Sequence, residues 1–154
     1  MQSPPPTRRW SFGLVASSLG AALLLATAPA PAGEVPVFLG SIGVGKATPE
    51  VGTELRALMR AELRAQDFSR VKSNERYVLS ATLLRLDSTQ SSDSVRATCV
   101  VSVAVLRENG ATLYAVIRGR ATAEEAKARV DVARSDALRA AVHSAMVRVP
   151  QALR

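Results

Sequence analysis

The sequence predicts an α+β fold, a two-layer sandwich in which two helices pack on one face of a mainly antiparallel sheet. Residues 95–105 carry valine, alanine or cysteine at every second position, as a half-buried strand does. Two other segments, one on each side of the strand-forming region, repeat apolar residues at helical spacing. The predicted order of elements is β-α-β-β-β-α, and packing the two apolar layers against each other is the economical way to bury them.

The first strand is expected over residues 35–44, an apolar run bounded by glycines, with Pro36 near its start. A helix should then begin at Thr48-Pro49-Glu50, because threonine caps, proline suits the first turn and glutamate complements the helix dipole. It should end near Gln66. Its apolar stripe comprises Val51, Leu55, Leu58, Met59 and Leu63. A short extended piece over residues 67–71 should bury Phe68 and Val71.

Three strands are expected next, over residues 76–87, 94–108 and 111–123, with a polar loop at 88–93. A two-residue turn at Asn109-Gly110 would place arginines on the apolar face of the last strand. A three-residue turn with a left-handed Gly110 instead pairs Val105 with Leu113 and keeps apolar residues together. The sequence therefore predicts the three-residue, bulged turn.

The second helix is expected after a charged linker at 124–131, with Ser135 as its cap and Asp136 in its first turn. Its apolar stripe comprises Leu138, Ala141, Val142, Ala145, Met146 and Val149. Pro150 should stop the helix or kink its last turn. Arg139, His143 and Arg148 fall off the stripe.

Residues 1–32 have the order of an export signal: a basic start with Arg8 and Arg9, an apolar run over 12–28 and small residues before Gly33. We expect cleavage near Ala32 and a single α+β domain over 33–154 in the periplasm or at the outer membrane. An uncleaved membrane anchor is the alternative. The arginine pair leaves both the twin-arginine and the general export route open, and the oligomeric state is open too.

The domain over 33–154 is basic. Removing Arg8 and Arg9 from the 20 lysines and arginines leaves 18 against 13 acidic residues, a net charge of +5. Such a surface suits an anionic partner, such as lipid head groups, cell-wall polymer or an acidic protein, and it equally suits ordinary solubility. Cys99 is the only cysteine, so the chain forms no internal disulfide, and its position in the alternation predicts a buried thiol.

The stretch from Gly40 to Lys46 nearly matches a phosphate-binding loop of the G-x-x-x-x-G-K-[ST] type. Ala47 stands where the metal-binding hydroxyl should be, and Pro49 removes an amide donor from the helix start. We therefore expect a strand-to-helix turn and no nucleotide. Its glycines and Lys46 remain candidates for a rim that a partner contacts.

Nothing in the sequence forms a catalytic constellation, and we expect a protein that is not an enzyme and has no cofactor and no metal. His143 is the only histidine, and it lies on the polar side of the last helix. A Cys99–His143 pair would need both side chains at one exposed cleft, whereas a buried thiol is inert. The serines occur in no G-x-S-x-G turn, and the carboxylates form no pair.

The one patterned surface is the outer face of the sheet, away from the helices. Arg96, Thr98, Arg118 and Arg120 should gather toward one end, and Val100, Ala104, Tyr114 and Val116 toward the other. Either another part of the chain covers the apolar half, or the face binds a partner. The candidate partner-binding residues are Arg96, Val100, Tyr114, Val116, Arg118 and Arg120. One tyrosine beside arginines is too little to predict nucleic-acid binding.

Several short stretches resemble known envelope domains. Residues 35–71 resemble their opening strand, helix and short strand, "RYVLSATLLRL" resembles their next strand, and residues 136–153 are similar to their closing helix. The families are the amino-terminal domain of the Tol-Pal propeller protein, the curli-secretion-channel lipoproteins and the lipoprotein activators of penicillin-binding proteins. The chain has no cysteine near the cleavage region for a lipid anchor, and it has no propeller.

The resemblance implies a non-catalytic module that binds envelope proteins. We therefore expect an exported protein that acts as a protein-binding or assembly module in the periplasm or at the outer membrane, with self-association as one form of it. The alternative is a binder of anionic lipid or cell-wall polymer through surface arginines, in peripheral contact with the membrane or wall. A small enzyme ranks third.

Overall fold

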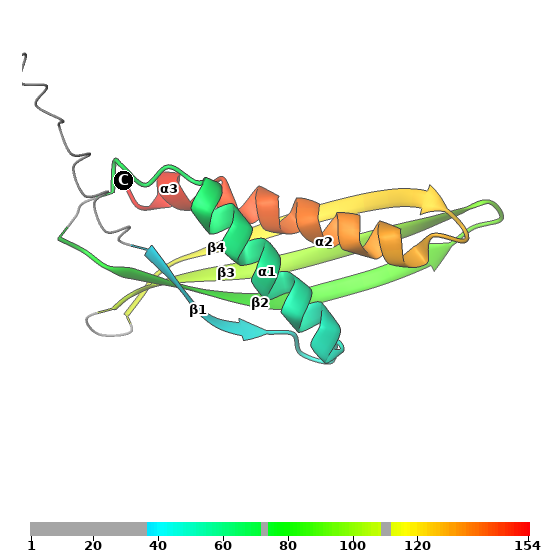
Figure 1. Ribbon diagram of the computed structural model, residues 1–154, viewed down its shortest axis with the longest axis horizontal. Coiled ribbons are helices and arrows are strands. Elements are labelled where there is room, and N and C mark those ends of the chain that lie inside the picture. The colour runs from blue at the N-terminus through cyan, green and yellow to red at the C-terminus, as the bar shows by residue number, and fades with distance from the viewer. Residues whose placement is uncertain (1–36, 72–73, 109–111) are drawn as a thin grey trace, which may run out of the picture. The chain divides into compact units, whose positions relative to one another are not determined.

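The computed structural model describes residues 37–71, 74–108 and 112–154. These residues form a four-stranded sheet and three helices, and the predicted order is confirmed with one short helix added at the end (Figure 1). The elements are β1 (Val37–Gly43), α1 (Pro49–Ala65), β2 (Tyr77–Gln90), β3 (Ser94–Arg107), β4 (Thr112–Ala126), α2 (Val130–Met146) and α3 (Val149–Ala152). The predicted export signal over 1–32, and the predicted start of the first strand at 35–36, lie outside the described residues.

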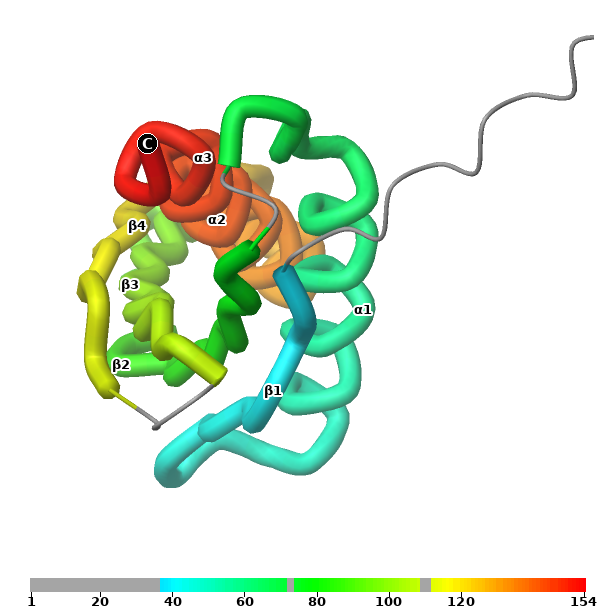
Figure 2. Tube along the Cα trace, turned by 90° about the vertical axis from the view of Figure 1, so that its left-hand side faces the viewer, coloured from blue at the N-terminus to red at the C-terminus, as the bar shows by residue number. Residues whose placement is uncertain are grey.

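The strands lie in the order β1-β2-β3-β4, and only the β1–β2 pair is parallel. Parallel neighbours need a crossover connection, and α1 supplies it. Figure 2 shows α1 and α2 on the same side of the sheet. Two polar contacts join the helices: Ser135 donates a hydrogen bond to Glu54, and His143 Nδ1 lies 3.1 Å from Glu62 Oε2. The other face of the sheet carries no helix of the described residues.

The core lies between the sheet and the helices, and its buried side chains come from the predicted apolar positions. All six alternating residues of β3 are fully buried: Val95, Ala97, Cys99, Val101, Val103 and Val105. The predicted stripe from Leu138 to Met146 of α2 is likewise buried, as is Val149 of α3, and Leu55 and Met59 bring α1 into the same cluster. Phe68 and Val71 are buried as predicted, but they lie in a turn that the amide of Val71 closes on the carbonyl of Phe68, not in an extended piece.

At Gly119 the sheet and α2 approach each other very closely. A Cβ added there would lie 1.9 Å from the carbonyl oxygen of Ala141 and 2.9 Å from the amide nitrogen of Ala145. The backbone of α2 therefore rests directly on the backbone of β4, which only a residue without a side chain permits.

Several predicted boundaries are wrong, because the structure extends elements into segments whose composition indicates loops. β2 continues through Ser88, Thr89 and Gln90, since these residues pair with β3, and the loop shrinks to three residues. β4 runs on through Glu124 and Glu125 for the same reason. α2 begins at Val130, so Ser135 lies inside it and contacts α1 instead of capping. Cross-strand and helix–helix pairing outweigh local propensity at these places.

The predicted pairing of β3 with β4 has the correct faces from Ala115 onward but the wrong register. Val105 lies opposite Ala115 and Val103 opposite Ile117, a shift of two residues from the expected partners. The irregularity falls between Val105 and Leu106, where Tyr114 is the extra residue of β4. The expected left-handed Gly110 lies outside the described residues.

Candidate functional site

The candidate residues of β3 and β4 alternate with the buried ones, so all but Tyr114 lie on the outer face of the sheet. Val100 lies opposite Arg120, Ser102 opposite Arg118, and Ala104 opposite Val116. Arg96 lies opposite Glu124, near the other end of the pair. The structure thus brings five of the six candidate partner-binding residues to one face.

The basic end of this face has fewer unpaired arginines than the sequence predicts, because Arg96 pairs with Glu124. The Nη2 of Arg96 donates to Glu124 Oε2 at 2.8 Å, and Ser94 Oγ donates to the same carboxylate. These hydrogen bonds hold the pKa of Glu124 below its ordinary value. Arg96 is therefore neutralised by a residue that composition places in a linker. Arg118 and Arg120 are exposed and have no side-chain ion pair with any other described residue.

Tyr114 is a correction to the predicted face. Its ring lies 5.4 Å from the ring of Tyr77, a buried residue on the helix side, and 5.1 Å from the guanidinium of Arg107. The bulge at Tyr114 causes this, because an extra residue shifts the alternation by one. Burial, with a hydrogen bond to Glu75, raises the pKa of Tyr77 to about 12. Tyr114 therefore belongs to an aromatic cluster on the helix side.

The same bulge moves Leu113 in the opposite direction. The alternation predicts it inside, but it pairs with Leu106 of the outer face and is 58% exposed. Val116 is 52% exposed nearby. Together with the partly buried Ala104, these residues form an apolar patch at the end of the sheet near the β3–β4 connection. No described segment covers this patch, so the alternative that another part of the chain buries it has no support in the described residues.

The phosphate-loop resemblance does not survive in the structure. The chain turns at Gly45, which has a φ of +57°, and α1 begins only at Pro49. Lys46 therefore precedes the helix by most of a turn, and the helix start has no side-chain cap at Thr48. The turn is the strand-to-helix connection that the sequence predicts.

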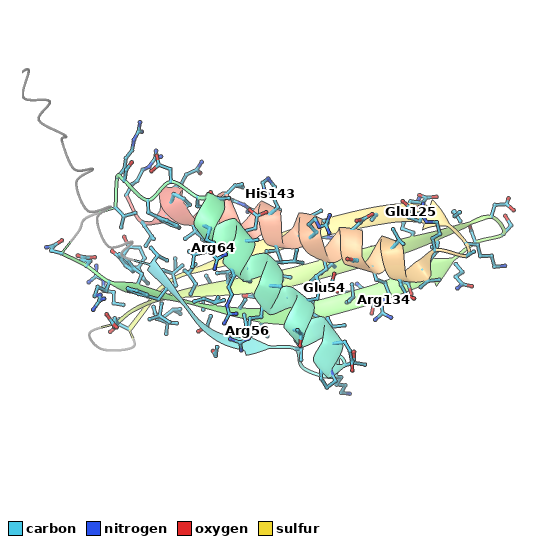
Figure 3. The ribbon with its side chains drawn as sticks, in the orientation of Figure 1. Glu54, Arg56, Arg64, Glu125, Arg134 and His143 are labelled. Carbon is cyan, nitrogen blue, oxygen red and sulfur yellow. The ribbon has the colours of Figure 1, made fainter. Side chains whose placement is uncertain are left out.

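The two residues considered for catalysis do not share a site, because Cys99 of β3 lies in the core and His143 of α2 lies on the surface. Cys99 is fully buried, and desolvation raises the pKa of its thiol to about 11, so the reactive thiolate is suppressed. His143 is exposed on α2, where Figure 3 labels it, and its Nδ1 contacts Glu62 of α1. In the described part of the chain, no three histidine, cysteine or carboxylate residues come together as a metal site. Nor does that part contain a helix long and apolar enough to cross a membrane.

Comparison with known proteins gives structural likeness alone. No family model matches the chain, and no curated protein matches it. A PelC variant from Paraburkholderia phytofirmans, solved as a dodecamer, is 18% identical, covers 82% of this chain and 94% of its own, and has a TM-score of 0.53. A protein of the DUF330 family from Xanthomonas campestris is 14% identical, covers 80% and 90%, and has the same TM-score of 0.53.

A third similar structure, a minor lipoprotein from Acinetobacter baumannii, is 11% identical, covers 77% and 92%, and has a TM-score of 0.49. The first two likenesses show that this chain shares its fold with PelC and the DUF330 protein. Both likenesses are under 25% identical, so they show the fold alone. The likeness does not select among the Tol-Pal, curli-channel and penicillin-binding-protein-activator families.

Proposed function

We propose that the protein is an exported, non-catalytic module of the cell envelope that binds another protein or a second copy of itself. The observation that carries this proposal is the outer face of the sheet, where the apolar patch of Leu113, Val116 and Ala104 adjoins Arg118 and Arg120. The helices pack on the other face of the sheet and form the core there, so the outer face does not contribute to that core. Apolar residues beside arginine are a composition typical of protein interfaces.

The fold comparison supports assembly as the mode of action. PelC, which shares the fold, was solved as a dodecamer. Here the backbone of β4 has a neighbour strand on one side only, since it ends the sheet order. An edge strand next to an apolar patch is a surface that a second chain can extend. The export signal predicted over residues 1–32 favours an envelope location, periplasmic or at the outer membrane.

The runner-up function, binding of anionic lipid or cell-wall polymer, rests on Arg118 and Arg120. Both are exposed on a strand, and neither has a carboxylate partner among the described residues. Ionic strength separates the two functions, because contacts between exposed charges are screened by salt whereas apolar contacts are not. We propose no catalytic reaction, since the one thiol is buried and the one histidine forms a contact between helices.

A photocrosslinking amino acid placed at Val116 in living cells tests the proposal, with Ala61, exposed on α1, as the matched control position. We expect one or a few defined crosslinked proteins from Val116 and none from Ala61. Identification of the product by mass spectrometry separates a second copy of the chain from another envelope protein. The same crosslinks from both positions, or none from Val116, would contradict a binding face on the sheet.

The double change Arg118→Glu and Arg120→Glu tests the runner-up. If the partner is a protein held by the apolar patch, crosslinking at Val116 persists in this variant and at raised salt. If the partner is an anionic polymer or lipid, binding falls steeply in both conditions.

A further inference from the structure

A cavity of about 490 Å³ opens on the opposite edge of the sheet from β4. Its walls come from three elements: the turn Val44–Ala47 after β1, the residues Leu83–Asp87 of β2, and Arg134 of α2. This volume lies within the roughly 300–1,000 Å³ typical of sites for small molecules. Figure 3 shows Arg134 extending from α2 over this part of the sheet.

The cavity exists because β1 is shorter than β2. The last β1–β2 pair joins Gly43 to Thr82, after which the chain turns away through Gly45. β2 continues without a partner on that side, and its pairing with β3 is irregular at Leu84. The irregularity leaves Leu84 as an extra residue, 52% exposed, in the wall of the cavity.

The charges around the cavity are unbalanced. Arg85 and Asp87 form an ion pair with each other, so they offer no net charge. Lys46 and Arg134 also line the cavity, and neither has an ion pair or side-chain hydrogen bond with any of the described residues. Two cations from different elements thus face one hollow, and its only carboxylate is already occupied. Such an arrangement attracts an anion.

The rest of the wall is aliphatic. Val44, Leu83, Leu84 and Leu86 line it together with Ala47. A bare phosphate or carboxylate would use the two cations and leave the exposed Leu84 in water. An anion that carries an aliphatic chain would satisfy both features, because its burial against Leu84 removes apolar surface from water.

We infer that this cavity binds a small amphipathic anion, with a phosphate or carboxylate between Lys46 and Arg134 and an aliphatic body against Leu84. The site is independent of the proposed protein-binding face, since it uses neither Arg118 nor Arg120 and lies at the other edge of the sheet. The inference also gives a role to Lys46. Its turn resembles a phosphate-binding loop in sequence, but in the structure it is a strand-to-helix connection.

Isothermal titration of the purified protein with decyl phosphate, inorganic phosphate and decanol tests the inference. We expect decyl phosphate to bind at least tenfold more tightly than either of the others, since it alone uses both parts of the site. Arg134→Gln and Lys46→Gln should each weaken decyl phosphate about tenfold, the loss expected for one charge-assisted contact. Arg139→Gln, an exposed arginine of the same helix, is the matched control and should change nothing.

Leu84→Ser separates the two halves of the site: it should weaken decyl phosphate and leave inorganic phosphate unchanged. Vesicles with and without phosphatidylglycerol identify the source of the anion. Binding of monomeric decyl phosphate alone indicates a free amphiphile, and binding of anionic vesicles that also depends on Arg134 indicates a bilayer lipid. Equal affinity for decyl phosphate and inorganic phosphate, or equal losses in Arg134→Gln and Arg139→Gln, would overturn the inference.

Discussion

Among the described glycines, Gly119 is the one whose replacement by alanine should destabilise the fold most. The added Cβ would lie 1.9 Å from the carbonyl oxygen of Ala141 and 2.9 Å from the amide nitrogen of Ala145. Both atoms belong to the backbone of α2, so no side-chain rotation relieves the contact. The helix must move away from β4 by more than an ångström, and this loosens the packing of Leu138, Val142 and Met146 on the sheet.

The expected cost is about 3 kcal/mol, the upper part of the range for overpacked cores. With a urea m-value of about 2 kcal/mol/M, the unfolding midpoint falls by about 1.5 M. The melting temperature falls by about 12 °C, at roughly 4 °C per kcal/mol for a domain of this size. Far-UV circular dichroism during urea and thermal unfolding measures both.

Gly43→Ala is the matched control, a strand glycine whose added Cβ would meet Thr82 no closer than 3.4 Å. That distance is an ordinary contact, so the free energy of unfolding should change by less than about 1 kcal/mol. If Gly119→Ala and Gly43→Ala unfold at the same urea concentration, then the close approach of α2 to β4 does not exist in solution.

Three further measurements follow from the buried thiol and from the ion pair on the sheet. Cys99→Ser should lower the free energy of unfolding by about 1–3 kcal/mol, because it buries a hydroxyl where the structure offers a thiol-sized apolar space; a urea midpoint equal to wild type would refute it. In the native protein, the pKa of Cys99 near 11 should keep it unreactive toward a thiol reagent at pH 8 until urea unfolds the chain, and rapid native labelling would show the thiol to be accessible. Carboxylate titration by NMR should find the pKa of Glu124 below its ordinary value, and Arg96→Gln should raise it. Because that pKa is lowered by folding, the carboxylate stabilises the fold above its ordinary pKa and loses this effect as pH falls through the lowered value; an unchanged titration in the variant would contradict the pairing.

Periodicity predicts the buried faces well, and it fails where the alternation is interrupted. The six alternating residues from Val95 to Val105 are all buried because nothing disturbs the period of two in β3. In β4 a single extra residue exchanges the faces of Leu113 and Tyr114, and no local feature of the sequence marks the bulge. The predicted turn placed the irregularity at Gly110, since glycine is the usual signal for it.

One of the two candidate sites can be predicted from the sequence and the other cannot. The arginines of β4 are predictable because the alternation fixes their face. Lys46 and Arg134 are far apart in the sequence, and they meet at one cavity because β1 pairs with β2 and α2 packs on the sheet. From the sequence, Leu84 is an ordinary apolar residue of a strand. Its exposure follows from the irregular pairing of β2 with β3, which the sequence does not indicate. A cavity at the end of a short strand depends on where that strand stops, which composition does not specify.

The parallel pairing of β1 also sets an order of events during synthesis. Val37 pairs with Tyr77, so β1 has no partner until α1 and the start of β2 have left the ribosome. β2 and β3, by contrast, each pair with the next strand along the chain. The part of the described chain that is made first is therefore paired only after all of α1 has been made. Until then its apolar residues, Val37, Leu39 and Ile42, are available to whatever receives the emerging chain.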